Sequence, residues 1–309
     1  MPLVASETLA LVTVTHDSAA ELEALLSTID RHLPGVDLIV VDCASSDDTV
    51  NVARRWRSQT SVRVLALQQN VGFGRGCNIG VAAVSRPVTA LVNPDVELLD
   101  DSLMALAEEA MRPPQRLLAP LVLNADGSRQ DTVHPRPTSI ADLARMVVPP
   151  GLAPRRAAVP LAPWRADRPR RVGWAVGCAL VAQTALLRRL GPFDERIFLY
   201  YEDLDLALRA GEHGVETWFW PSAQVLHHGA HASQREFGGE PFDLHARARR
   251  EVVARRLGPR RAQLDDAAQA ATFFSRIVSK GVLGRSTVRE RGQLGALVRA
   301  RREHGARRG

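Results

Sequence analysis

Residues 88–98, with the sequence VTALVNPDVEL, decide the fold of this chain. The apolar run Val88–Val92 is long enough for a buried strand, and the turn-forming residues Asn93-Pro94-Asp95 end it. Proline fixes its own φ and favours an extended conformation for the residue before it. The pattern therefore predicts a buried strand whose carboxyl end holds the Asn93 and Asp95 side chains on one side of a stiff turn.

Asn93 and Asp95 carry the oxygen ligands that a hard divalent cation such as Mg2+ or Mn2+ prefers. Such cations usually keep several water molecules, which leaves room for the oxygens of a bound diphosphate. Asn-Pro-Asp is also ordinary turn chemistry, so an exposed aspartate in a simple turn is the alternative interpretation.

Outward from this stretch, the first half of the chain alternates strands with helices. Further apolar strands are predicted at Leu9–Thr15, Leu38–Val41 and Val62–Leu67, and helical spacing of apolar residues follows them. This alternation predicts an α/β fold with a mostly parallel sheet and helices on both faces. Because ligands of such sheets bind at the carboxyl ends of the strands, we expect Asp42, the loop after residue 70 and Asp95 to share one rim.

Two segments on this rim are candidates for binding a nucleotide. Asp42 and Cys43 close a strand, where a helix-capping aspartate is the alternative interpretation. The glycines of NVGFGRGCN (70–78) are typical of a loop that brings the backbone and Arg75 close to a diphosphate, or of a tight turn. The third glycine of a dinucleotide fingerprint is missing and no GxxxxGK[ST] motif occurs, so neither a nicotinamide site nor a P-loop is predicted.

A predicted helix in the second half begins near Glu202-Asp203-Leu-Asp205. Asp205 has a structural explanation, because it can pair with Arg209 at i, i+4. Glu202 and Asp203 follow an aromatic run at the helix entry, where a carboxylate can face a cleft and be partly desolvated, as a general base requires. Helix capping is the alternative role for these two side chains.

His227 and His228 follow a segment that reads as a strand ending near Pro221 and a short apolar continuation. Histidines on a loop after a strand are candidate metal ligands, and ordinary core or surface histidines are the alternative. The absence of an HExxH motif and of cysteine partners argues against a zinc hydrolase.

The composition, with 45% hydrophobic and 24% charged residues among 309, is that of an ordinary soluble protein. Three cysteines lie far apart in the sequence, which predicts neither a disulfide framework nor a zinc site and fits a reducing cytosol. Prolines recur and periodicity is lost in residues 127–171, where we expect a long lid or binding loop.

Basic residues concentrate at the carboxyl end of the chain, where 17 Arg or Lys stand against 5 Asp or Glu from His245 onward. We expect a domain over residues 1–235 and a basic, mostly helical extension over 236–309. Such an extension binds nucleic acid or an anionic membrane surface, or is simply a solvated helical face. Few aromatic residues and no nucleic-acid motif favour the membrane over nucleic acid. The apolar face of the interfacial helix is then expected at Phe273, Phe274, Ile277, Val278 and Val282.

Five blocks of sequence together resemble family 2 glycosyltransferases of the GT-A fold, and in particular the bacterial rhamnosyltransferase-like subgroup. They are VDCASSDDT (41–49), NVGFGRGCNIG (70–80), NPDVEL (93–98), GPFDERIFLYYEDLDLALR (191–209) and HHGAHAS (227–233). The blocks stand in the order of the family, so their combination is far more specific than any one of them.

The resemblance implies an inverting sugar transfer from a nucleoside-diphosphate sugar to an acceptor hydroxyl, assisted by Mg2+ or Mn2+. Asp95 matches the last acidic position of the DxD metal motif, with Asn93 in place of the first aspartate. Asp203 matches the catalytic base in the ED pair that it forms with Glu202. One of His227 and His228 is similar to an additional metal ligand, with His227 slightly favoured.

The resemblance also places the nucleotide-sugar donor. Its predicted contacts are Thr15, Asp42, Cys43, Asn70, Arg75, Asn78 and Asn93. Cys43 stands where Asn or Asp is usual in the family, so the choice of nucleobase stays open.

The subgroup implies dTDP-rhamnose as the donor and a glycan or polyprenyl-diphosphate-linked acceptor, in cell-envelope polysaccharide synthesis at the inner face of the cell membrane. Acceptor contacts are expected in residues 128–171 and 174–178. A non-catalytic protein that binds nucleotide sugars or glycans is the alternative, and it would be indicated by loss of Asp95 or Asp203, both of which are present.

Overall fold

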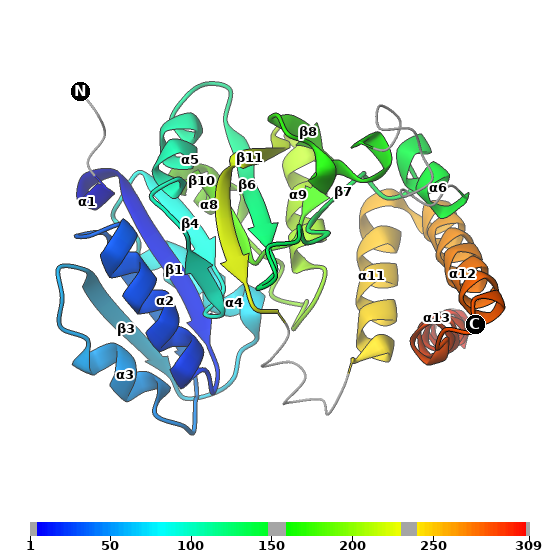
Figure 1. Ribbon diagram of the computed structural model, residues 1–309, viewed down its shortest axis with the longest axis horizontal. Helices are drawn as coiled ribbons and strands as arrows, with labels where there is room; N and C mark the ends of the chain where they lie inside the picture. The colour runs from blue at the N-terminus through cyan, green and yellow to red at the C-terminus, as the bar shows by residue number, and fades with distance from the viewer. Residues whose placement is uncertain (1–4, 148–158, 230–239, 307–309) are drawn as a thin grey trace.

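The structure is a computed structural model that describes residues 5–147, 159–229 and 240–306 (Figure 1). Its strands are β1 (Leu9–Thr15), β2 (Asp37–Cys43), β3 (Ser61–Leu67), β4 (Val88–Val92), β5 (Val96–Leu98), β6 (Arg116–Leu123), β7 (Val133–His134), β8 (Arg170–Val172), β9 (Trp174–Ala175), β10 (Ala179–Gln183) and β11 (Glu216–His227). Its helices are α1 (Ala5–Thr8), α2 (Ala19–His32), α3 (Thr49–Arg55), α4 (Phe73–Ala83), α5 (Leu103–Ala110), α6 (Ile140–Val147), α8 (Thr184–Leu190), α9 (Glu202–Glu212), α11 (Phe242–Leu257), α12 (Pro259–Val282) and α13 (Val288–Ala306), with a 3-10 turn η1 (Pro163–Arg165).

The main sheet has the order β3-β2-β1-β4-β10-β6-β11-β5, with β8 added against β11. The strands β3, β2, β1 and β4 are parallel, as the alternating pattern predicts. Beyond β4, β10 is antiparallel to both of its neighbours, and β5 is antiparallel to β11. The predicted α/β class is therefore confirmed, and the antiparallel strands of the second half are the part that the periodicity did not reveal.

Helices cover both faces of this sheet because successive strand residues point to opposite sides. In β1, Leu9 and Leu11 pack with α2 and α5 in one core, while Ala10 and Val12 pack with α4 and α8 in the other. All four residues are at most 1% exposed. The strands are thus apolar on both faces, which is why they read as continuous hydrophobic runs.

The glycine-rich stretch is mostly a helix, which corrects the expectation of a loop over 70–78. Helix α4 begins at Phe73, directly after Gly72, whose φ of +82° is a conformation that favours glycine. Gly76 and Gly80 lie within the helix and face β1, where a Cβ on Gly80 would stand 2.3 Å from a Val12 methyl group. These glycines therefore allow close packing of α4 on the sheet.

The C-terminal helices α11, α12 and α13 lie together beside α9 (Figure 1). Val252 and Val253 of α11 share a buried cluster with Leu204 and Leu208 of α9. The fully buried Asp205 accepts hydrogen bonds from Arg209 and from Arg256, each with a shortest distance of 2.7 Å. The predicted i, i+4 pair is thus present, and the same carboxylate also joins α9 to α11.

Two further expectations need correction. Residues 127–171 are not uniformly irregular, because β7, α6, η1 and β8 form within them and α6 packs against α12. The strand expected to end at Pro221 continues as β11 to His227, with an irregularity in its register between Trp220 and Gln224 that accommodates the proline. The expected domain boundary at 235 and His231 lie outside the described residues.

We predict that Gly80→Ala lowers the free energy of unfolding by about 1 to 3 kcal/mol, because the β-branched Val12 in the middle of a strand cannot move aside. Gly211→Ala is the matched control, since a Cβ there meets nothing within 4 Å and α9 gains a better helix former. Urea denaturation measures both. Equal stability of the two variants would show that the α4–β1 contact is looser than described.

Candidate active site

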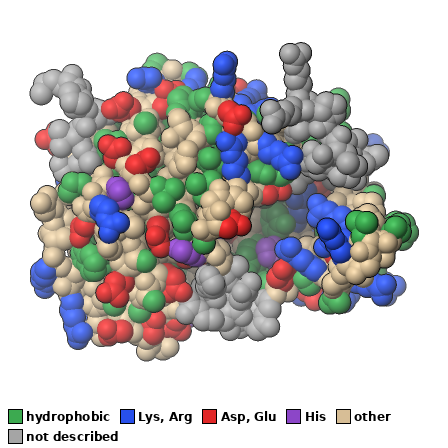
Figure 2. All heavy atoms as spheres, viewed as in Figure 1, with side chains coloured by type: hydrophobic (Ala, Val, Ile, Leu, Met, Phe, Trp, Pro, Cys, Tyr) green, Lys and Arg blue, Asp and Glu red, His purple; other side chains and the backbone are tan. Residues whose placement is uncertain are grey.

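A cavity of about 930 Å3 lies at the carboxyl ends of the parallel strands. Figure 2 shows a hollow between the sheet and the C-terminal helices, with Lys and Arg side chains on the helical side. The residues predicted from the sequence that line this cavity are Thr15, Cys43, Asn70, Asn93, Asp95, Glu202, Asp203 and His227. Both halves of the chain therefore contribute to one site.

Asp95 and His227 meet at one wall of the cavity because β5 pairs with the end of β11. In that pairing Val96 lies opposite His227, so the turn residue before β5 comes next to the last residue of β11. The Asp95 Oδ1 to His227 Nε2 distance is 3.3 Å, and both side chains are largely buried. Gln130 contacts the other ring nitrogen of His227 at 3.1 Å and so orients the imidazole.

The donor set at this wall suits a hard cation that also binds a diphosphate. Asn93 Oδ1 is buried beside Asp95 and makes no hydrogen bond within the described part of the chain, so it retains the capacity to accept one more interaction. Among the described residues, no three side chains of His, Cys, Asp or Glu gather closely enough to hold a metal. One carboxylate, completed by phosphate oxygens and water, is the kind of site in which Mg2+ is bound with its substrate, and His227 places an imidazole beside that carboxylate.

His228 lies apart from this wall. Its Nε2 is 2.6 Å from Glu97 Oε1, and only its backbone N–H reaches the Asp95 carbonyl, at 3.1 Å. Of the two histidines left open by the sequence, the geometry thus brings His227 to Asp95 and turns the His228 ring toward a different carboxylate.

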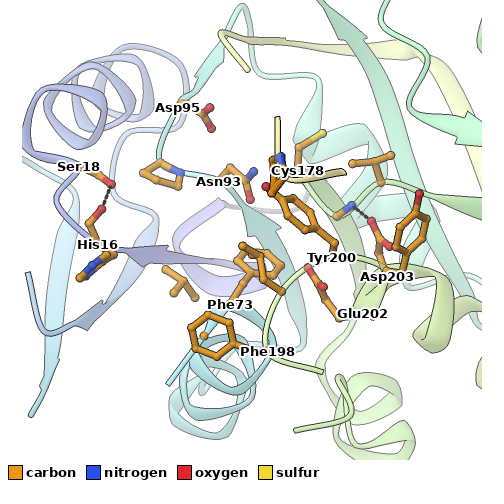
Figure 3. A pocket seen from close by; sticks show the side chains of 18 of the residues that line it. His16, Ser18, Phe73, Asn93, Asp95, Cys178, Phe198, Tyr200, Glu202 and Asp203 are labelled. Atoms are coloured by element: carbon orange, nitrogen blue, oxygen red, sulfur yellow. Dashed lines mark hydrogen bonds between the residues drawn. The ribbon is translucent and has the colours of Figure 1, made fainter. Parts of the chain in front are cut away.

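Asp203 and Glu202 lie on the other side of the cavity, at the first turn of α9 (Figure 3). Asp203 accepts hydrogen bonds from the backbone N–H groups of Gly177, at 2.9 Å, and Leu204, at 2.6 Å. Glu202 is buried, and its Oε2 has no hydrogen-bond partner among the described residues. The two adjacent carboxyl groups thus differ in support, because Asp203 accepts from the backbone of two other residues, whereas one oxygen of Glu202 has no partner among the described residues.

Burial raises the pKa of both groups. Desolvation raises the pKa of Asp203 to about 6, against the lowering effect of its backbone hydrogen bonds. Desolvation and then the charge of Asp203 raise the pKa of Glu202 to about 8. The pair titrates in two steps, and Asp203 is the member that loses its proton first. At neutral pH the site therefore presents one carboxylate and one neutral acid.

Unusual backbone conformations precede this helix. Tyr200 and Tyr201 have φ angles of +70° and +63°, in the left-handed region that non-glycine residues rarely adopt. The Tyr200 ring stacks on His245 of α11 at 3.8 Å between centroids, and the Tyr201 ring contacts Trp174 at 6.0 Å. Packing from the C-terminal helix thus helps to hold the turn that presents Glu202 and Asp203.

Thr15, Asp42 and Cys43 lie at the ends of β1 and β2. The buried Asp42 accepts hydrogen bonds from the Thr15 hydroxyl, at 3.0 Å, and from the N–H and hydroxyl groups of Ser45. Asp42 itself does not line the cavity, whereas Thr15 and Cys43 do. Burial, the largest cause, raises the pKa of the Cys43 thiol, so it faces the cavity as a neutral group.

Of the three donor contacts predicted in residues 70–78, one lines the cavity and two do not. Asn70 lines the cavity and accepts a hydrogen bond from the Gly72 N–H at 3.0 Å. Asn78 makes two hydrogen bonds to the backbone of Phe193 and lies outside the cavity lining. Arg75 is more than half exposed and pairs with Glu195 at 3.6 Å, also outside that lining. Both side chains are thus engaged with the segment 193–195 instead of the cavity.

Other cavity residues were missed by reading the sequence. They are chiefly His16, Phe198, Tyr200, His245 and Arg289. Trp174 and Gly177 also line the cavity, and they lie in the range 174–178 where acceptor contacts are expected. Only the aromatic run before Glu202 gave a signal in the sequence. Gly177 acts through its backbone, and His245 and Arg289 reach the cavity only because the C-terminal helices fold back beside α9.

The fold and the site together define a GT-A glycosyltransferase. Its parallel strands end at the cavity, and acidic residues line two sides of that cavity. The chain matches the family described as Glycosyl transferase family 2 over residues 10–158. It is 31% identical over 252 residues to the N-acetylglucosaminyl-diphospho-decaprenol L-rhamnosyltransferase of Mycobacterium tuberculosis, covering 75% of this chain and 79% of that protein. The chain belongs to glycosyl transferase family 2, which confirms the expected glycosyltransferase enzyme.

Another relative is also a rhamnosyltransferase. Rhamnosyltransferase WbbL of Escherichia coli K12 is 27% identical over 194 residues, covering 60% of this chain and 71% of that protein. Among solved structures, the mannosyltransferase PcManGT of Pyrobaculum calidifontis, in complex with GDP-Man and Mn2+, has a TM-score of 0.61 at 13% identity, covering 94% of this chain and 85% of that one. S. aureus TarS 1-349 in complex with UDP has a TM-score of 0.52 at 15% identity, covering 95% and 80%. At these identities the solved structures support the fold alone.

Within the described residues, no helix combines the length and apolar composition that a membrane span requires.

We predict that Glu202→Gln changes how stability depends on pH. Because its raised pKa makes folded Glu202 hold a proton that the unfolded chain releases, wild-type stability falls as pH rises from about 4.5 towards about 8. Glutamine cannot ionise, so the stability of the variant relative to wild type should increase over this range by on the order of 4 kcal/mol.

Urea denaturation at several pH values measures this difference. Glu212→Gln, at an exposed position of the same helix, is the control and should leave the pH dependence as in wild type. A difference between Glu202→Gln and wild type that stays constant with pH would mean that folded Glu202 is ionised throughout.

Proposed function

We propose that this glycosyltransferase moves rhamnose from dTDP-rhamnose to a hydroxyl group of a polyprenyl-diphosphate-linked sugar, with inversion at the anomeric carbon. The observation that carries the proposal is that Asp95 and Asp203 line one cavity, on different sides of it (Figure 3). The identity of the sugar and of the acceptor is supported by the rhamnosyltransferases among the relatives, one of which is named for an N-acetylglucosaminyl-diphospho-decaprenol substrate.

The donor binds along the wall formed by the ends of β1, β2 and β4. Thr15, Cys43 and Asn70 line the part of the cavity on the nucleotide side, and Asp42 fixes Thr15 and the loop after β2. Asp95, His227 and Asn93 would hold Mg2+ or Mn2+ against the diphosphate. The bound cation would offset the negative charge that develops on the departing nucleoside diphosphate.

Asp203 is the general base in this proposal. The acceptor oxygen forms a bond to the anomeric carbon while the bond from that carbon to the diphosphate breaks, and the nucleoside diphosphate leaves with the electron pair. The hydroxyl proton passes to Asp203, whose carboxylate is aimed by the N–H groups of Gly177 and Leu204. No second carboxylate nucleophile is needed, because the transfer is a single displacement.

Glu202 supports the base by staying neutral. A second negative charge beside Asp203 would raise the cost of ionising it further, whereas a protonated Glu202 avoids that repulsion. The acceptor would approach between α9 and the C-terminal helices, where Trp174, Tyr200 and His245 line the cavity. A polyprenyl-linked acceptor lies in a bilayer, so we infer that the enzyme works peripherally at the inner face of the cell membrane.

Binding of dTDP is predicted to require both a divalent metal and Asp95. Isothermal titration of dTDP with Mn2+ should show binding to wild type that disappears in Asp95→Asn and on addition of a chelator. His227→Ala should weaken it by about tenfold or more. His228→Ala is the matched control and should bind within about twofold of wild type, because its ring pairs with Glu97 and stays outside the cavity lining.

Titrations with UDP and GDP under the same conditions test the nucleobase. Tighter binding of either than of dTDP would redirect the donor assignment. Equal, metal-independent binding of all three by wild type and Asp95→Asn would overturn the metal site.

Removal of the base is predicted to abolish turnover without affecting donor binding. Asp203→Asn should lower kcat for rhamnose transfer about a thousandfold while leaving the Kd for dTDP within about twofold. In wild type, kcat should rise with pH through about 6, as Asp203 loses its proton, and then level off.

The assay uses dTDP-rhamnose and a diphosphate-linked N-acetylglucosamine on a short prenyl chain. Asp126→Asn, on an exposed turn, serves as the control for loss of a carboxylate. Retention of most of the wild-type kcat by Asp203→Asn would exclude it as the base, and a product of unchanged anomeric configuration would exclude single displacement.

A further inference from the structure

An exposed apolar line runs along the end of α12. Phe274, Val278 and Val282 recur at every fourth position, so they lie on one face of the helix, and they are 62%, 50% and 83% exposed. Leu283 and Val288, on either side of the short connection to α13, are 67% and 77% exposed. We call these five residues the α12 edge. Phe273 and Ile277, which the sequence pattern had placed with them, are partly buried instead.

Single exposed apolar residues are common on protein surfaces, but a continuous group of five is not. Each side chain of the α12 edge is at least half exposed although the surrounding helices pack closely with one another. Figure 2 shows hydrophobic side chains at the outer side of the C-terminal helices. Such a group is typical of a surface that contacts a partner or a membrane while the protein functions.

Arginines lie beside the part of this edge near the start of α13. Arg285 is on the connection, two residues after Leu283, and Arg291 is one turn after Val288 on α13, and both are exposed. They belong to the segment that carries 17 basic against 5 acidic residues from His245 onward. Apolar side chains flanked by arginine are the combination by which interfacial helices bind anionic lipid, since the apolar groups enter the acyl region and the cations face the headgroups.

The α12 edge is also adjacent in sequence to a residue that lines the active-site cavity. Val288 belongs to the edge, and the following residue, Arg289, lines the cavity and pairs with Glu240 at 2.9 Å. His245 of α11 lines the same side of the cavity. Helix α13, which begins at Val288 of the edge, therefore also contributes a side chain to the wall of the site.

We propose that the α12 edge is the surface by which this protein binds an anionic phospholipid bilayer, and that this contact places the cavity at the membrane for a lipid-linked acceptor. The second part rests on the proposed function. A second copy of the chain is a poorer occupant because the flanking arginines would face each other across a symmetric contact. Nucleic acid would be attracted by the arginines but would leave the apolar side chains without a partner.

Flotation of the full chain with vesicles tests the surface. Wild type should float with vesicles of phosphatidylcholine and phosphatidylglycerol, and much less with phosphatidylcholine alone. The triple variant Phe274→Ser/Val278→Ser/Val282→Ser should reduce the bound fraction at least about tenfold. Arg285→Gln/Arg291→Gln should reduce it by about fivefold for each arginine, and less at high salt.

Matched controls separate this surface from general loss of charge or apolar area. Arg54→Gln/Arg55→Gln removes two exposed arginines from α3, and Val298→Ser removes an exposed valine of α13 outside the edge. Both should float as wild type does. Flotation of the triple variant equal to that of wild type would overturn the proposal, as would failure of wild type to float with either vesicle.

Two further measurements identify another occupant. A dimer of wild type in sedimentation velocity that the triple variant abolishes would assign the edge to self-association. Loss of duplex DNA binding in the arginine variant, with flotation unchanged, would assign the basic surface to nucleic acid. Either result would contradict the membrane proposal.

Rhamnose transfer distinguishes failure of the surface from failure of the proposed function. The triple variant should keep wild-type activity on a water-soluble, short-prenyl acceptor and lose it on a long-chain polyprenyl acceptor embedded in anionic vesicles. Lipid binding without activity on any acceptor would leave the surface standing and refute the proposed reaction. Equal activity of wild type and triple variant on the embedded acceptor would refute the link between the edge and the acceptor.

Discussion

The antiparallel pairing of β5 with β11 is the constraint on which the site depends. The chain leaves strand β4 at Asn93, turns at Pro94 and re-enters the sheet at Val96. Val96 lies opposite His227, so Asp95 is the last residue of the turn. This register alone brings Asp95 to within 3.3 Å of the imidazole. Because side chains alternate along a strand, a slip of one residue would turn His227 away and present its neighbour.

A second constraint acts on the opposite wall. The turn before α9 has two consecutive tyrosines in the left-handed region, and such a conformation persists only where the surroundings hold it. His245 and Trp174 supply ring contacts, and Arg256 of α11 bonds Asp205 one turn into the helix. The C-terminal helices are thus part of the machinery that positions the carboxyl pair, in addition to forming one side of the cavity.

Much of the first half was predictable because its signals are local. The apolar run of β4 and its Asn-Pro-Asp end follow from periodicity and proline geometry, and the structure confirms both. The glycine stretch misled, because glycine disfavours helices in isolation while its small size here lets α4 approach Val12. The roles of Asn78 and Arg75 as donor contacts stay predictions, and their observed partners are Phe193 and Glu195.

What could not be predicted depends on pairing between distant segments. The choice between His227 and His228 requires the β5–β11 register, and the support of Asp203 by Gly177 requires two loops to meet. The two walls of the cavity also differ in their ionisable groups. One wall of the cavity joins the Asp95 carboxylate to the His227 imidazole, whereas burial on the wall with Asp203 limits the adjacent pair to one charge at neutral pH. In the proposed single displacement, Asp203 on one wall would be the base, and the departing diphosphate would lie at the wall with Asp95.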